Sequence, residues 1–118
     1  MTGVQTCALP ICFSDQRVPT LREVLEVIRG RSKLVIELKY YGHDQQLEQR
    51  VVDIVEQAGM SADVVVMSLK LDGVKKLQGL RPDWSTGLLA ASAVGDLSRL
   101  DVDFLDRKST RLNSSHRL

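Results

Sequence analysis

The sequence predicts an α/β protein with about four parallel strands, arranged as part of a TIM (β/α) barrel. Helical and strand patterns alternate strictly along the chain with short connections, which is typical of right-handed β-α-β units and a parallel sheet. No glycine-rich phosphate-binding fingerprint follows a predicted strand, because Gly87 and Gly95 are isolated. This disfavours a doubly wound nucleotide-binding sheet. A barrel, of which four strands are about half, is the better choice.

The two ends of the chain are expected not to belong to this fold. Residues 1–11 resemble the conceptual translation of a sequencing-library adapter, and residues 106–118 resemble the other strand of the same adapter. As a signal peptide, residues 1–11 would lack a basic region and a long enough apolar run. The alternative for residues 106–118 is a basic tail that binds nucleic acid. We therefore expect residues 12–105 to be a fragment of a barrel domain between two non-native segments.

Composition gives no argument for a nucleic acid partner and leaves membrane association of the parent protein open. The whole chain has 16 Lys and Arg against 15 Asp and Glu. Residues 106–118 hold four of these cations and one of the anions, so residues 12–105 carry a net charge near −2. Without a basic bias we expect no nucleic acid partner. Cys7 and Cys12 lie in or beside the adapter-like segment and indicate no redox compartment. No apolar run is long enough to span a bilayer, and the sequence does not indicate a localisation.

The first predicted helix begins after Thr20. Thr20 and Glu23 have the spacing of a capping box, in which each side chain binds the other residue's backbone N–H. Gly30 suits the left-handed position just past the helix end. Residues 33–38 then predict a strand. The apolar residues at helical spacing are Leu21, Val24, Leu25 and Ile28.

Three further helices, each followed by a strand, complete the order. Asp44 is expected to cap a second helix that ends at Gly59. Strands are predicted over residues 63–69, 87–89 and 102–105, with a third helix over about 72–80 and one or two helical turns over 95–100. The buried stripe of the second helix is expected to comprise Leu47, Val51, Ile54, Val55 and Ala58.

The first strand ends in a charged pair. Alternate side chains of a strand share a face, so Val35, Glu37 and Lys39 lie opposite the apolar row that contains Ile36 and Leu38. Parallel barrel strands carry their reactive groups at the C-terminal end. Glu37 and Lys39 are therefore candidate catalytic residues, and the alternative is an ordinary ion pair on a half-exposed strand.

Several short motifs occur in an order that is typical of one enzyme family. Val18-Pro19-Thr20-Leu21 precedes a helix and then a strand ending Glu37-Leu38-Lys39. A second strand ends in Ser68-Leu69, and Arg81-Pro82 and the last two predicted strands follow. This order resembles the glycerophosphodiester phosphodiesterase family, in which a Pro-Thr-Leu segment leads to Glu-x-Lys and a later strand ends in Ser-Phe. The resemblance covers about residues 17–105.

The resemblance implies a TIM barrel that hydrolyses glycerophosphodiesters to an alcohol and glycerol 3-phosphate, a reaction of lipid and glycerol metabolism. It implies a divalent cation, Mg²⁺ or Ca²⁺, with Glu37 as a metal ligand. It places Lys39 at the substrate phosphate, as a catalytic and substrate-binding residue. These residue types suit the chemistry, because hard cations select carboxylate oxygens and a phosphoryl transition state is stabilised by nearby positive charge.

The chain also departs from the family pattern. The family's His-Arg pair, Glu-x-Asp ligands and second catalytic His precede the Pro-Thr-Leu segment and are absent here, so the fragment itself is expected to be inactive. His43 follows the strand and is expected to be an ordinary loop residue, with a substrate contact at the mouth of the barrel as the alternative. Ser68 is a candidate substrate-binding residue or a small packing residue, and Leu69 replaces the family's Phe. Tyr40 and Tyr41 either border the substrate glycerol or are exposed loop aromatics.

Two alternatives to the enzyme stay open. One is a non-catalytic binding or scaffold protein, derived from a barrel, that keeps a phosphate or lipid-headgroup pocket. The other is an unrelated parallel α/β domain in which Glu37 and Lys39 form only an ion pair.

Overall fold

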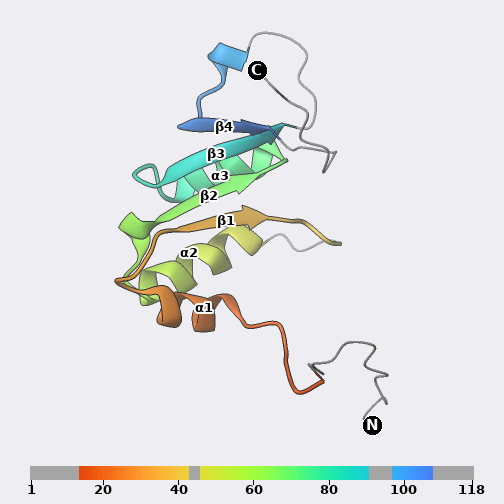
Figure 1. Cartoon of the computed structure of the whole chain (residues 1–118). Helices are drawn as coiled ribbons and strands as arrows, with labels where there is room; N and C mark the ends of the chain where they lie inside the picture. The colour runs from red at the N-terminus through yellow and green to blue at the C-terminus, as the bar shows by residue number, and fades with distance from the viewer. Residues whose placement is uncertain (1–13, 43–45, 91–96, 108–118) are drawn as a thin grey trace, which may run out of the picture.

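The computed structural model describes residues 14–42, 46–90 and 97–107. The four strands form one sheet in the order β1-β2-β3-β4, and each neighbouring pair is parallel. The prediction of four parallel strands alternating with helices is therefore confirmed. In chain order the elements are α1 (Leu21–Ile28), β1 (Leu34–Leu38), α2 (Leu47–Gln57), η1 (Ser61–Asp63), β2 (Val64–Ser68), α3 (Leu71–Leu80), β3 (Ser85–Ala90), η2 (Leu97–Arg99) and β4 (Phe104–Arg107) (Figure 1).

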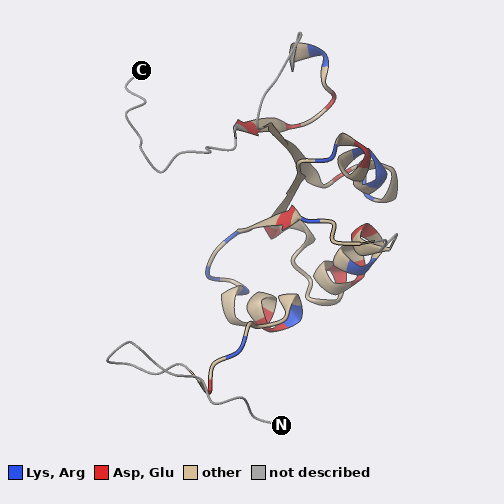
Figure 2. Ribbon diagram, turned by 90° about the vertical axis from the view of Figure 1, so that its right-hand side faces the viewer, with Lys and Arg blue, Asp and Glu red and all other residues tan. Residues whose placement is uncertain are grey.

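One face of the sheet is covered by helices and the other is open among the described residues. Figure 2 shows the sheet edge-on with α2 and α3 on the same side. The helices also pack on one another, α1 on α2 and α2 on α3. On the opposite face, Val35 is 58% exposed. The buried core under the helices comprises Leu25, Leu38, Val51, Val52, Val55, Ala58, Met60, Val64, Val66, Leu77 and Trp84.

The predicted start and end of α1 are confirmed. The Thr20 hydroxyl accepts the Glu23 N–H at 3.3 Å, and Glu23 Oε2 accepts the Thr20 N–H at 2.8 Å. Arg17 also donates to this carboxylate. The hydrogen bond from Arg17, followed by those from Thr20, lowers the pKa of Glu23 to about 2. Gly30, with φ 72°, takes the left-handed conformation expected past the helix end.

Several predicted boundaries are wrong. The third strand, β3, begins at Ser85 and not at residue 87. The N-cap of α2 is Gln46 and not Asp44, which lies with His43 outside the described residues. Glu48, in the first turn, supplies the negative charge that a helix N-terminus favours. The fourth strand begins at Phe104 and not at residue 102. The reason is that the Asp103 carboxylate accepts the Thr86 N–H at 2.5 Å, which holds this residue as a bend before the ladder begins.

The expected non-native segments lie mostly outside the described residues. Residues 1–11 and 108–118 are not described. Asp106 and Arg107 belong to β4 and pair with Leu89 and Ala90. This pairing uses backbone groups, which every residue except proline supplies in full, so the boundary at residue 105 stays a prediction.

The exposure of α1 predicts the effect of two truncations on stability. Leu25 is 0% exposed and Val27, on the same helix, is 65% exposed. We expect Leu25→Ala to lower the free energy of unfolding by about 2–5 kcal/mol, because it leaves a cavity. Val27→Ala should change it by less than about 0.5 kcal/mol. Urea denaturation of both variants measures the difference, and equal losses would mean that α1 does not pack as described.

Candidate active site

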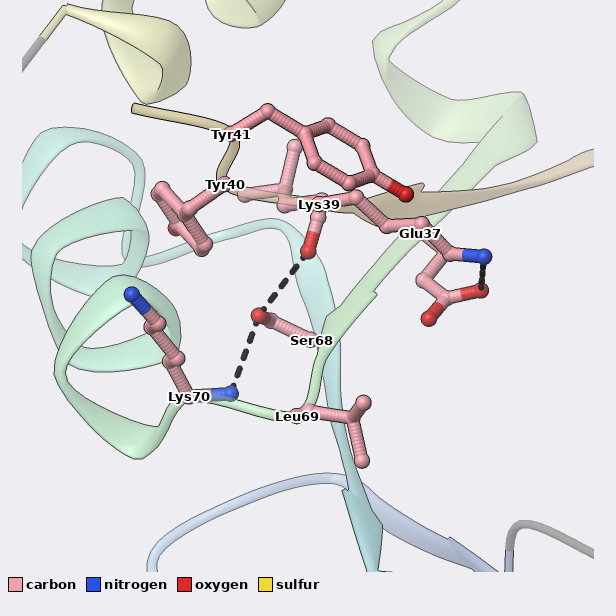
Figure 3. A pocket seen from close by; sticks show the side chains of 8 residues that line it. Glu37, Lys39, Tyr40, Tyr41, Ser68, Leu69 and Lys70 are labelled. Atoms are coloured by element: carbon pink, nitrogen blue, oxygen red, sulfur yellow. Dashed lines mark hydrogen bonds and ion pairs between the residues drawn. The ribbon is translucent and has the colours of Figure 1, made fainter. Parts of the chain in front are cut away.

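A pocket of about 250 Å³ opens where β1 and β2 end. The ladder pairs Leu38 with Ser68, so the carboxyl ends of the two parallel strands lie at one edge of the sheet. The three candidate site residues, Glu37, Lys39 and Ser68, all line this pocket (Figure 3). The full lining is Glu37, Leu38, Lys39, Tyr40, Tyr41, Ser68, Leu69 and Lys70.

The two faces of β1 separate as the alternation predicts. Leu38 is 4% exposed within the core, and Leu34 and Ile36 pack against that core. Glu37 and Lys39 lie on the open face, where Lys39 Nζ is 3.6 Å from Glu37 Oε2 (Figure 3). Ion pairs this exposed contribute about 0–1 kcal/mol. Exchange of Lys39 for another cation would therefore cost Glu37 little.

Ser68 ties the ends of the two strands together. Its side chain is fully buried, and its hydroxyl donates to the Leu38 carbonyl at 3.1 Å and accepts the Lys70 N–H at 3.1 Å. The only proton of the hydroxyl is thus used inside the protein. Ser68 is both a packing residue and part of the pocket wall, and its contact with a substrate stays a prediction.

Tyr40 lines the pocket and is held in place by a hydrogen bond to a buried carboxylate. Its hydroxyl donates to Glu48 Oε1 at 2.7 Å, and Lys76 Nζ donates to Glu48 Oε2 at 2.8 Å. A side chain at Gly73 would collide with the ring, because an added Cβ would lie 1.9 Å from the Tyr40 hydroxyl oxygen. Burial, followed by the Glu48 carboxylate, raises the pKa of Tyr40, so the phenol stays neutral.

Glu48 is a buried charge with two donors. It is 3% exposed. Burial acts to raise its pKa, but the hydrogen bonds from Lys76 and Tyr40 outweigh burial and hold the pKa below its ordinary value. Glu48 is therefore a carboxylate at neutral pH, and its two hydrogen bonds fix the position of Tyr40.

Sequence reasoning missed Glu48, Lys70 and the role of Gly73. Glu48 lies three residues before Val51 and four before Val52, a spacing that puts it on the buried face of α2. Lys70 follows β2 much as Lys39 follows β1, and parallel strands end at a common edge. Both signals were present in the sequence. The need for glycine at position 73 has no sequence signal, because it depends on a ring from another element.

The described residues do not form a complete metal site. Glu37 is the one carboxylate in the pocket lining. Within residues 14–42, 46–90 and 97–107, no group of three His, Cys, Asp or Glu side chains could hold a metal ion. Hard cations such as Ca²⁺ take six to eight oxygen ligands. The residues present therefore fit one ligand of such a site and not the whole of it.

Four parallel strands that alternate with helices, with a charged pocket at the carboxyl ends of β1 and β2, define an α/β protein. Comparisons with known proteins identify its relatives. No model of a known protein family matches the sequence. The chain is 31% identical over 110 residues to the putative glycerophosphodiester phosphodiesterase YhdW of Bacillus subtilis (strain 168), over 86% of this chain and 44% of YhdW. The crystal structure of a putative glycerophosphodiester phosphodiesterase from Galdieria sulphuraria matches the fold, with a TM-score of 0.64 and 22% identity over 75% of this chain and 41% of that one.

The chain is thus a distant homologue of glycerophosphodiester phosphodiesterases. It spans less than half the length of either relative. Among the described helices none is long and apolar enough to cross a membrane.

The anchoring of Tyr40 predicts a difference between the two pocket tyrosines. Tyr40→Phe removes one of the donors to buried Glu48 and should lower the free energy of unfolding by about 2 kcal/mol, the usual size for a hydrogen bond to a charged group. Tyr41, which is 84% exposed, is the matched control, and Tyr41→Phe should change it by less than about 0.5 kcal/mol. Thermal and urea unfolding measure both. An unchanged stability in Tyr40→Phe would contradict the network.

Proposed function

We propose that this chain carries part of the active site of a metal-dependent glycerophosphodiester phosphodiesterase, which hydrolyses glycerophosphodiesters to an alcohol and glycerol 3-phosphate. The observation that carries the proposal is the position of Glu37 and Lys39 in one pocket at the carboxyl end of β1, on the helix-free face. Barrel enzymes place their chemistry at that end. The relation to YhdW supports the substrate class.

The pocket residues have distinct roles in this proposal. Glu37 supplies one oxygen ligand to Mg²⁺ or Ca²⁺, and the remaining ligands come from outside the described residues. Such a cation, when bound, neutralises charge on phosphoryl oxygens. Lys39 holds the substrate phosphate and stabilises the charge that develops on it during hydrolysis. Ser68 is the proposed substrate contact in the pocket wall between the two strand ends, where its hydroxyl is hydrogen-bonded to Leu38 and Lys70 in the free chain.

This chain by itself should not hydrolyse glycerophosphodiesters. Glu37 is the one carboxylate in the lining formed by the described residues, and a hard cation needs several oxygen ligands. We expect no release of glycerol 3-phosphate from glycerophosphocholine in the presence of Mg²⁺ or Ca²⁺, measured with a coupled dehydrogenase assay. Turnover that a chelator abolishes would show that the chain holds a complete site.

Within a whole barrel that contains this sequence, substitutions at Glu37 and at Lys39 should change kcat and metal activation in different ways. Glu37→Gln should lower kcat by at least about 100-fold and should weaken activation by the metal. The loss should be larger than the roughly 10- to 100-fold typical of residues that only hydrogen-bond to a metal ligand, because Glu37 is itself a ligand. Lys39→Met should lower kcat by about 100- to 1,000-fold with little change in metal dependence, because it acts on the phosphate. Metal titrations of initial rates measure both effects.

The control for these two variants is Glu26→Gln, which changes an exposed residue of α1 and should leave turnover intact. Normal turnover and metal activation in Glu37→Gln would remove Glu37 from the site.

The second candidate is a non-catalytic protein with a phosphate or headgroup pocket. The two lysines of the pocket lining favour it, because ammonium groups bind phosphate without a metal. Two measurements distinguish this candidate from the enzyme. Binding of glycerol 3-phosphate to the whole barrel would be independent of metal, and no ester would be hydrolysed.

A further inference from the structure

The pocket contains a second lysine that the proposed function does not use. Lys70 is exposed and lines the pocket. Its Nζ lies over the Tyr40 ring, 4.9 Å from the ring centroid. Lys39 is paired with Glu37, whereas no carboxylate of the described part of the chain forms an ion pair with Lys70. The lining therefore has two ammonium groups and one carboxylate.

The two ammonium groups lie on opposite sides of the pocket. Figure 3 shows the pair of Glu37 and Lys39 on one side, and Lys70 beside Tyr40 on the other, with Ser68 between them. A ligand that fills the pocket with its phosphate at Lys39 would have another of its groups near Lys70, because Lys70 lines the other side of the same pocket. The Lys70 side chain, which would contact this second group of the ligand, is a cation.

The backbone and the ring that position Lys70 are both fixed. The Lys70 N–H is bound to the buried Ser68 hydroxyl, which places the residue at the start of α3. The Tyr40 ring is held by Glu48 on one side and fits only because residue 73 is glycine. The ammonium of Lys70 thus has a rigid aromatic surface beneath it.

This arrangement discriminates between alcohol groups by charge. Choline and ethanolamine are cations, and aromatic faces are the usual protein surface for binding such groups. Here Lys70 occupies the face of Tyr40 and repels a second cation. An anionic group would instead gain a charge-assisted hydrogen bond from Nζ.

We propose that Lys70 is a specificity-determining residue, which binds an anionic group on the alcohol part of a glycerophosphodiester and disfavours a purely cationic alcohol. This inference rests on the proposed function, because it assumes that the phosphodiester itself lies at Lys39.

The test compares two esters that differ by one carboxylate. Glycerophosphoserine and glycerophosphoethanolamine are titrated separately into the full chain, with the amide signals of Tyr40, Leu69 and Lys70 followed by NMR. The expected dissociation constant of the serine ester is about 10-fold lower, the value of one hydrogen bond to a charged group. Lys70→Met should bring the ratio to about one, and Lys70→Glu should reverse the preference.

The matched control is Lys75→Met, which removes an exposed lysine of α3 outside the pocket and should keep the preference. Reversal by Lys70→Glu is a gain of binding for the ethanolamine ester, which an unfolded variant cannot produce. Equal affinities in the unmodified chain, a preference that survives Lys70→Met, or no binding of either ester would each overturn the role of Lys70.

The outcomes separate this inference from the proposed function. If both esters bind through Lys39 without a contribution from Lys70, the inference fails and the proposed function stands. O-phosphoserine and inorganic phosphate are titrated as probes without glycerol. If these two shift the Lys70 signals while neither ester binds, Lys70 contacts free anions only, and the ester specificity is rejected. The proposed function is tested separately, by the turnover of a whole barrel that contains this sequence.

Discussion

Burial of one face of β1 determines where the charged side chains of the pocket lie. Leu34, Ile36 and Leu38 pack toward the helices, and alternation along the strand sends the intervening side chains to the opposite face. A shift of one residue in register would place Glu37 under α2 without a partner, at a large desolvation cost. The apolar packing of the sheet therefore also positions the candidate chemistry.

The pocket wall depends on a buried charge in addition to apolar packing. Glu48 is nearly inaccessible and accepts hydrogen bonds from Tyr40 and Lys76. A buried carboxylate of this kind contributes little net stability, because desolvation offsets much of the attraction. It does impose a single arrangement on its donors, since loss of either hydrogen bond leaves the charge poorly satisfied. Rigidity of Tyr40 follows from that requirement.

Local patterns in the sequence predicted most of the fold. The capping box at Thr20, the glycine ends of α1 and α2 and the valine run of β2 each act within a few residues, so their signals are readable without tertiary information. The start of β4 was misplaced, because it depends on the contact between Asp103 and Thr86 on another strand.

The sequence predicted which residues line the candidate site but not the contacts that hold Tyr40 in place. The placement of Glu37 and Lys39 on one open face followed from strand alternation, and their meeting with Ser68 followed from parallel pairing. The contacts among Tyr40, Glu48 and Gly73 join a loop and two helices. Such contacts arise only once the helices are packed, and for this reason the sequence did not reveal them.

The strand order also bears on how the sheet assembles. Every strand pairs with the next one along the chain, and the separation between partners shrinks from Leu34 and Val64, through Val65 and Ser85, to Gly87 and Phe104. The entropy lost in closing a loop grows with its length, so joining β1 to β2 costs more than either later pairing. The pocket needs that first pairing, since its walls come from both strands. Its formation is thus tied to the closure that costs the most chain entropy in the sheet.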